Sequence, residues 1–192
     1  MKNPGLFLLS CYGVIAVSFL FAQAEKTGDE GFEWSVGILN QKRKSEIALN
    51  RPVRMETGDV FSFRLKSGAG CFAYVVAQHS DGSAAFYRGV LEAGKTVDAG
   101  PFDISGPGGA ETFYIIACAA EQTALDAAIA AYKTAPDPDQ AARGVANEIF
   151  KLRRAVSRLN EKPEKQVSLG DGVRGLEFSG ADAYVKTVTV EH

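Results

Sequence analysis

Apolar and polar residues alternate along several short segments of the chain, and a period of two is typical of a strand with one buried face. Trp34, Val36 and Ile38 alternate in this way with small residues. The segment 71–79 is apolar at successive positions, which predicts a central strand buried on both faces. The pattern predicts strands at 34–38, 53–55, 60–66, 71–79, 84–87, 112–119, 174–178 and 184–190, with a charged loop at 41–46.

Turn residues separate these strands. Asp81 and Gly82 lie between two strand patterns, and a hairpin is predicted there because glycine tolerates the positive φ of a tight turn. The run 106–109, Gly-Pro-Gly-Gly, suits neither a helix nor a regular strand and predicts a loop. Within 60–66 every second residue is polar, which predicts that this face meets solvent: Ser62, Arg64 and Lys66.

The period changes to that of a helix between residues 120 and 160. Thr123 to Asp126 resembles a capping box at the start of a first helix. A second start is predicted at Asp137, which would cap the helix, with Pro138 at its first position. Further along, one apolar stripe is expected to pack on a sheet: Val145, Ile149, Leu152, Val156 and Leu159.

The order of the elements predicts the fold class. Strands come first, then two helices, then strands again, and this order argues against a doubly wound parallel sheet. We expect an α+β fold, mainly β: an antiparallel β-sandwich or open barrel with a C-terminal pair of helices packed on it. The expected division is a flexible tail at 25–31 and a single globular domain at 32–192, with a β core at 51–119, the helical pair at 120–160 and the final strands at 174–191.

The N-terminus predicts export. A lysine at position 2, an uncharged run at 5–22 and the small residues Ala22 and Ala24 form a signal peptide at 1–24, with cleavage between Ala24 and Glu25. Two alternatives stay open. The apolar run approaches the ~20 residues that span a bilayer and could remain as an anchor. The segment 8–11 also resembles a lipobox ending at Cys11. All three place the rest of the chain outside the cytoplasm, in the periplasm or secreted.

Charge gives little guidance to a partner. The full chain has 21 basic and 23 acidic side chains, so that loss of Lys2 with the signal leaves a net charge of −3. Such a near-balanced composition gives no reason to expect nucleic acid or an anionic membrane as partner. No stretch beyond the signal is long and apolar enough to span a membrane. Another envelope protein or a glycan is the expected partner.

Two cysteines follow the signal, Cys71 and Cys118, each in a predicted strand. An even pair in an oxidising compartment is a candidate disulfide. The alternative is two buried thiols, which behave as small apolar side chains. The sequence does not decide between these two, because a bridge depends on the distance between the two Cα atoms.

Candidate chemistry is sparse. His79 is expected to be partly exposed beside the hairpin turn, and His192, the last residue, is expected to be mobile. Two histidines so far apart form no metal site of recognisable spacing. Five carboxylates fall in loops or at element ends, where we expect solvated turn residues: Asp59, Asp81, Asp98, Asp103 and Glu111.

A glycine motif matches by letter only. Residues 170–175 read G-x-G-x-x-G, which in a dinucleotide site joins a strand to the N-terminus of a helix. Here a strand pattern follows the glycines, so a glycine-rich turn is predicted. We therefore predict no catalytic residue, no cofactor and no metal ligand.

An ordered set of short motifs carries a resemblance to a known family. A Gly-Asp turn at 58–59 leads into a strand, followed by a strand containing Tyr74, the hairpin at 80–82, an Ala-Gly-Lys segment at 93–95 and a Gly-Pro-Gly-Gly-Ala-Glu loop at 106–111. Over about 51–119 the chain resembles the bacterial family called domain of unknown function 4384. The resemblance implies a non-catalytic accessory domain of an exported protein. The hairpin end at 86–88 departs from the family's pattern.

These observations favour an exported interaction module of the cell envelope. An exposed aromatic patch around Phe86, Tyr87 and the loop 106–111 would support this function. One alternative is an unrecognised envelope enzyme such as a hydrolase, which requires carboxylates or His79 to converge in a pocket. The other alternative is a purely structural envelope protein.

Overall fold

The structure is a computed structural model that describes residues 32–42, 45–47, 49, 52–105, 108–156, 165–180 and 183–192. Four features of the sequence analysis lie outside these residues: the predicted signal peptide, its cleavage site at Ala24 and Glu25, the lipobox cysteine Cys11 and the tail 25–31. They remain predictions.

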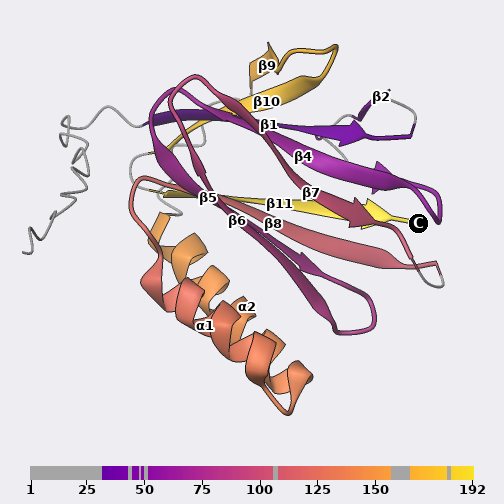
Figure 1. The fold of residues 1–192 in the computed structure, drawn as a ribbon, viewed down its shortest axis with the longest axis vertical. Coiled ribbons are helices and arrows are strands. Elements are labelled where there is room, and N and C mark those ends of the chain that lie inside the picture. The colour runs from indigo at the N-terminus through magenta and orange to yellow at the C-terminus, as the bar shows by residue number, and fades with distance from the viewer. Residues whose placement is uncertain are drawn as a thin grey trace, which may run out of the picture.

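Two sheets face one another in the described part of the chain (Figure 1). The first has the strand order β7-β4-β1-β10-β9, with β2 also paired to β1, and all its pairs are antiparallel. Its strands are β1 (Phe32–Asn40), β2 (Ser45–Ile47), β4 (Val60–Ser67), β7 (Thr96–Asp103), β9 (Lys165–Ser168) and β10 (Arg174–Gly180).

The second sheet has the order β3-β11-β8-β5-β6. Its pairs are antiparallel except β3 with β11, which is parallel. The predicted hairpin joins β5 to β6 through the turn at Gly82, whose φ is +87°. Its strands are β3 (Val53–Arg54), β5 (Cys71–Gln78), β6 (Ala84–Leu91), β8 (Ala110–Cys118) and β11 (Ala183–Glu191).

Alternating side chains from both sheets fill the space between them, as the period of two predicts. The ring of Phe113 lies among three others, with its centroid 5.3 Å from each of Phe61, Phe63 and Phe102. Edge-to-face and tilted contacts of this kind are worth about 1 kcal/mol each beyond the area they bury. This aromatic cluster stabilises the centre of the sandwich.

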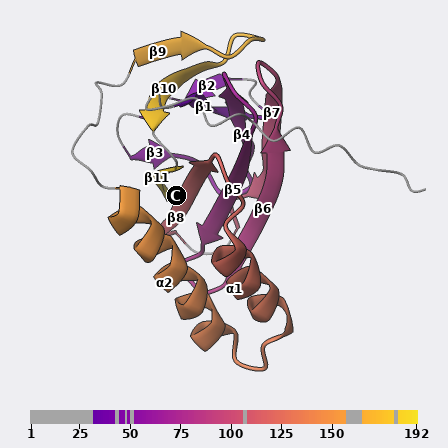
Figure 2. The ribbon, with the colours of Figure 1, turned by 90° about the vertical axis from the view of Figure 1, so that its left-hand side faces the viewer.

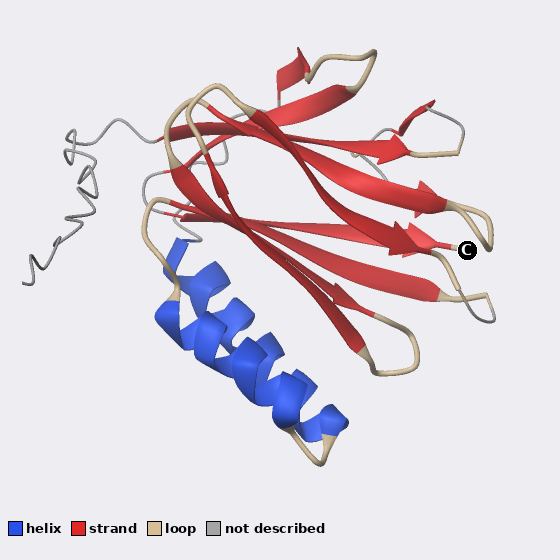
Figure 3. Cartoon of the chain, viewed as in Figure 1, coloured by secondary structure: helices blue, strands red, loops and turns tan. Residues whose placement is uncertain are grey.

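The two helices cover the outer face of the second sheet only (Figures 2 and 3). They are α1 (Thr123–Thr134) and α2 (Pro138–Val156). The opposite side chains of the same strands form a second core with the helices, in which Tyr74 and Ile116 pack against Leu125 and Ile149. The structure is therefore an α+β sandwich with a helical pair packed on it, as predicted. Leu159 of the predicted stripe lies outside the described residues.

The sequence pattern did not predict three of the strands, β2, β7 and β9. β7 contains a Gly-Pro pair and two aspartates, and β9 has one apolar residue, so neither shows strong alternation. The charged segment 41–46 was predicted to be a loop, but its last two residues belong to β2, which begins at Ser45. The predicted capping box is also wrong. Helix α1 is capped at Gln122 without a side-chain bond. Asp137 does cap α2, because its Oδ1 accepts the Gln140 N–H at 3.0 Å.

The prediction that the polar face of β4 meets solvent is wrong for Ser62 and Arg64. The turn between β9 and β10 folds over Arg64, and the Gln41 side-chain amide donates to the Ser62 hydroxyl at 2.8 Å. Ser62 is 2 % exposed and Arg64 is 8 % exposed. Arg64 donates to both carboxylate oxygens of Asp98, at 2.7 and 2.8 Å, and to Asp171 in the turn at 2.9 Å. The bond to Asp98 raises the pKa of Arg64, so that the guanidinium is charged at every accessible pH.

Candidate functional site

One end of the sandwich brings both described histidines to a single glutamate. In β8, Glu111 shares the inward face with Phe113 and Ile115. Thr112 pairs with Gln78 of β5 in an antiparallel register. Glu111, one residue before Thr112, therefore lies opposite His79, one residue after Gln78. His192 follows Val190 at the same parity at the end of β11, and thus also lies inward.

The three side chains are close together, and two of them, Glu111 and His192, are buried. His79 Nδ1 lies 3.2 Å from Glu111 Oε2, and His192 Nε2 lies 3.6 Å from Glu111 Oε1. The exposed fractions of the side chains are 3 % for Glu111, 25 % for His79 and 0 % for His192. Among the described residues, Glu111 Oε2 and both ring nitrogens of His192 have no partner in hydrogen-bond geometry. The site is therefore a buried polar cluster with bonding capacity left over.

The prediction that His192 is mobile is wrong in this structure. Its backbone N–H donates to the carbonyl of Gly109 at 3.0 Å, and its carbonyl accepts the N–H of Gly109 at 2.9 Å. A Cβ on Gly108 would lie 2.9 Å from the His192 oxygen, which leaves no room for a side chain there. The ladder between β11 and β8 thus extends to His192 and carries its ring into the cluster.

This arrangement places the His79 imidazole beside a carboxylate, within ion-pair distance but outside hydrogen-bond geometry. With Nδ1 of His79 facing the carboxylate, Nε2 is the ring nitrogen left for other partners, as in a general base held by an acid. The nearby Ser83 hydroxyl donates instead to Asp81 Oδ1 at 2.6 Å. Across the described residues, no three His, Cys, Asp or Glu side chains are arranged so that they could hold a metal ion.

Two of the five predicted surface carboxylates are buried. Glu111 is 2 % exposed and Asp59 is 5 % exposed, so the expectation of solvated turn residues is wrong for both. Asp59 Oδ2 accepts the backbone N–H of Glu56 at 3.1 Å. Its own backbone carbonyl accepts the N–H of Ile104 at 2.9 Å, which ties the turn before β4 to the end of β7. Asp59 therefore has a structural role.

The other three carboxylates lie on the surface. Asp81 closes the hairpin, where its Oδ1 accepts the Ser83 N–H at 2.8 Å, and the Ser83 hydroxyl bond lowers the pKa of Asp81. Asp103 is exposed at the end of β7. Asp98 is exposed but bound to Arg64. The expectation of solvated residues is confirmed for Asp81 and Asp103.

Cys71 and Cys118 are both free and buried, and they lie in different cores. Cys71 faces the space between the sheets, whereas Cys118 faces the helices. Side chains on opposite faces of one sheet point apart, which is incompatible with a disulfide. Burial raises the pKa of both thiols, that of Cys118 to about 12. The structure thus shows the second alternative, two buried thiols.

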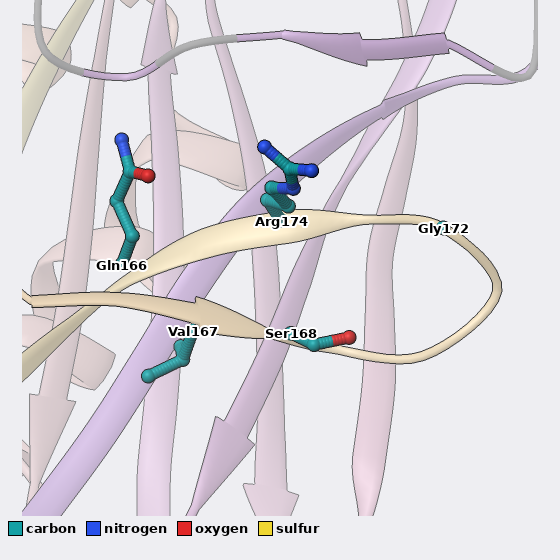
Figure 4. Close-up of a pocket in the computed structure, with 5 residues that line it drawn as sticks. All are labelled: Gln166, Val167, Ser168, Gly172 and Arg174. Carbon is teal, nitrogen blue, oxygen red and sulfur yellow. The ribbon is translucent and has the colours of Figure 1, made fainter.

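The glycine motif is a hairpin turn between β9 and β10, as predicted. Gly170 and Gly172 have φ values of +85° and +78°, and a strand follows them. An open depression of about 380 Å³ lies beside this hairpin (Figure 4). It is lined by Gln166, Val167, Ser168, Gly172 and Arg174. Gln166 and Arg174 point to one side of the hairpin while Val167 points away, so the lining side chains do not converge on one point.

The expected aromatic patch near the β5–β6 hairpin is covered. Phe86 packs edge-on against Tyr132 of α1, with centroids 5.1 Å apart, and Tyr87 is half-buried against the sandwich core. The first two residues of the loop 106–111 lie outside the described residues. A different residue of β6, Val90, is 59 % exposed. The apolar surface on this strand is therefore at its C-terminal half.

Strand β6 is the edge strand of the second sheet (Figure 2), and among the described residues no strand pairs with its outer side. The His79 N–H bonds to the Ser83 carbonyl at 2.9 Å, so in an antiparallel ladder the next residue, Ala84, points its N–H away from β5. The Ala84 N–H indeed bonds to the Tyr132 hydroxyl at 2.9 Å. By the same alternation, the residues whose backbone N–H and C=O groups point away from β5 are Phe86, Arg88 and Val90. We call these the outward-facing residues of β6.

A network of polar side chains joins β6 and β5 to the start of α1. Arg88 pairs with Asp126 at 2.8 Å and with Glu121 of the loop before α1. The Tyr74 hydroxyl donates to Asp126 Oδ2 at 3.2 Å and accepts the Gln122 N–H at 3.1 Å. Burial raises the pKa of Tyr74 above its usual value. The edge strand is thus fastened to α1 at its middle.

Comparisons of the chain with protein-family models, with curated proteins and with solved structures each found no match. The resemblance to the domain of unknown function 4384 family remains a prediction. Within the described residues, no helix is long and apolar enough to cross a membrane.

Proposed function

We propose that the chain is an exported binding domain of the cell envelope that takes an extended segment of a partner protein as an additional strand on β6. The observation that carries this proposal is the unpaired side of β6, defined by the outward-facing residues Phe86, Arg88 and Val90. An unpaired row of N–H and C=O groups is a template for strand addition. The N-terminal signal pattern supports export of the domain.

The side chains along this edge suit a strand of mixed character. Val90 is 59 % exposed and offers apolar surface at one end of the edge. Arg88 and its acidic partners lie at the middle, where a polar side chain of the incoming strand fits. Main-chain bonds supply the affinity in such complexes, and the alternate side chains supply the specificity. The partner segment is therefore extended, with an apolar residue next to Val90.

A library of random extended peptides displayed on phage tests the proposal. Selection on the purified protein is expected to enrich peptides with alternating apolar residues. Their binding should be lost in Val90→Pro, which removes an outward N–H without touching the ladder to β5. Binding that persists in Val90→Pro, or no enriched peptide at all, contradicts strand addition at β6. A pull-down from envelope extract should return a specific partner with the wild type and should lose that partner with Val90→Pro.

The His79 imidazole beside the buried Glu111 carboxylate favours an enzyme as the second candidate function. A general base would act through its Nε2, with the Glu111 carboxylate 3.2 Å from Nδ1. Hydrolysis of p-nitrophenyl esters and glycosides by the wild type, compared with His79→Asn and Glu111→Gln, tests this function. A rate lost in both variants supports an enzyme. Equal rates in all three proteins contradict it.

A further inference from the structure

The exposed face of α2 is positively charged, although the whole chain has a negative net charge. Between Arg143 and Arg154 the helix has four cations and one acid, whereas the full chain has a formal net charge of −2. The acid, Glu148, is already paired with Lys151 at 2.6 Å. The segment therefore has a local net charge of +3 in an acidic protein.

These cations lie on one side of the helix. At about 100° per residue, Arg143, Phe150 and Arg154 fall within about 40° of one another around the axis. Lys151 and Arg153 flank that line at about 100° and 60° from Phe150. All five side chains are exposed, whereas Val145 and Ile149 are buried in the core between the helices and the second sheet. Figure 2 shows α2 packed on that sheet. We name these five residues the α2 stripe; it is about 17 Å long.

An exposed aromatic ring stands within the α2 stripe. Phe150 is 58 % exposed, and with Val90 it is one of two large apolar side chains so exposed among the described residues. The guanidinium of Arg154 lies 5.9 Å from its ring centroid. The helix dipole favours Arg153 and Arg154 in the last turn, but it does not account for Arg143 or for the exposed ring. Arg143 and Arg153 form no ion pair with any described residue.

We infer that the α2 stripe binds an anionic phospholipid surface. A row of cations around one aromatic ring is complementary to such a surface, because the cations attract the headgroups and the ring enters the interface between headgroups and acyl chains. The long arginine side chains can reach phosphates while their apolar stems follow the ring inward. An extended acidic protein would satisfy the charges but would leave Phe150 without an apolar environment. This surface lies on the outer side of α2 and does not depend on strand addition at β6.

Vesicle sedimentation tests the inference with protein expressed from the full sequence. The apolar run 5–22 is common to all variants and to both vesicle types, so differences report on the α2 stripe. Wild type is expected to bind phosphatidylglycerol-containing vesicles more tightly than pure phosphatidylcholine vesicles. The preference should disappear in about 1 M salt, where the Debye length is about 3 Å.

Three variants identify the surface. Arg143→Gln/Arg153→Gln should weaken binding to anionic vesicles about 25-fold, at about fivefold for each cation. Phe150→Ala should weaken it about tenfold. The matched control Lys66→Gln/Lys95→Gln loses the same charge elsewhere and should change binding less than about twofold.

Three results overturn the inference. The first is equal binding of wild type to anionic and neutral vesicles. The second is an equal effect of the two double variants, which would assign binding to net charge alone. The third is binding to soluble polyglutamate without binding to vesicles, which would assign the α2 stripe to an acidic protein. Circular dichroism of each variant confirms that the helices remain folded.

Discussion

Strands β6 and β7 follow one another in the chain, and each forms the edge of a sheet, yet the two edges are built differently. β7 contains Pro101, which has no N–H to offer, and its pairing with β4 shifts register between Phe61 and Phe63. Both features block the addition of another strand. β6 has no proline, and it pairs with β5 in an unbroken register from Cys71 to Gln78.

The charged residues of the two edges differ in the same sense. On β7, Asp103 is exposed at the end of the strand, and a charge on an edge deters strand pairing. Asp98 of the same strand is paired with Arg64. On β6, the charged side chain is Arg88, which is paired with Asp126 and Glu121. Within the described residues, the β7 edge is thus protected against strand addition and the β6 edge is not. This difference supports β6 as the binding edge, since an unprotected edge is a liability unless a partner uses it.

The largest expected effect is a difference in stability between proline substitutions on the two sides of β6. Ala85→Pro removes an inward N–H from the ladder to β5, and we expect a loss of about 3 kcal/mol in the free energy of unfolding. Val90→Pro removes an outward N–H and should cost less than about 1 kcal/mol. Urea unfolding of both variants measures the difference. Equal losses would contradict the assignment of inward and outward residues.

The next effect concerns β7. Arg64→Met removes the guanidinium that binds Asp98 of this strand and Asp171 of the β9–β10 turn. We expect a loss of about 2 kcal/mol, below the usual cost of breaking a buried pair, because the aspartates left behind reach solvent. Lys66→Met, on the same face of β4, is the control and should change stability by less than about 0.5 kcal/mol. Faster amide exchange in β7 of Arg64→Met would accompany the loss.

Tyr74→Phe tests how α1 fastens β6. Loss of the hydroxyl bonds to Asp126 and Gln122 should cost about 1 kcal/mol at neutral pH. Because burial raises the pKa of Tyr74 in the fold, the unfolded chain ionises first, near pH 10. Stability is therefore unaffected by this group at lower pH and falls as pH rises through about 10.

The same alkaline titration compares the two proteins directly. Cys118, with its pKa raised to about 12, also lowers stability above about pH 9, but it does so in wild type and in Tyr74→Phe alike. The wild type should lose more stability than the variant between about pH 9 and 11. Parallel curves would show that the phenol is not buried in solution.

The smallest expected effect on stability is that of Val90→Lys. Val90 is 59 % exposed, so its replacement should change the free energy of unfolding by less than about 0.5 kcal/mol. A lysine on an edge strand nevertheless deters strand addition. Peptides selected on the wild type should therefore lose affinity for a variant of unchanged stability. Unchanged affinity would move the binding site away from β6.

Much of the fold was predictable because alternation is a local property. The inward face of β1 and the buried stripe of α2 followed from spacing alone. β7 and β9 did not, since their residues alternate weakly and they become strands by pairing with β4 and β10. The cover over Arg64 was equally hidden, because it comes from a turn more than a hundred residues away in the sequence.

The sequence does carry a signal for the buried cluster of Glu111, His79 and His192. Glu111 has the parity of Phe113 and Ile115, and His192 has that of Val188 and Val190, so both could have been predicted to point inward. Their meeting with His79 was not predictable, because it depends on β8 lying between β5 and β11. The separation of the two cysteines and the open side of β6 depend on sheet order in the same way.

Amide exchange along β6 in the free protein tests the central claim most directly. Hydrogen bonds to β5 should protect the inward amides of Ala85, Tyr87 and Gly89, whereas the outward amides of Phe86, Arg88 and Val90 should exchange rapidly. On addition of a selected peptide the outward amides should become protected as well. Outward amides as protected as their inward neighbours in the free protein would show that the edge is already covered, which would contradict strand addition at β6.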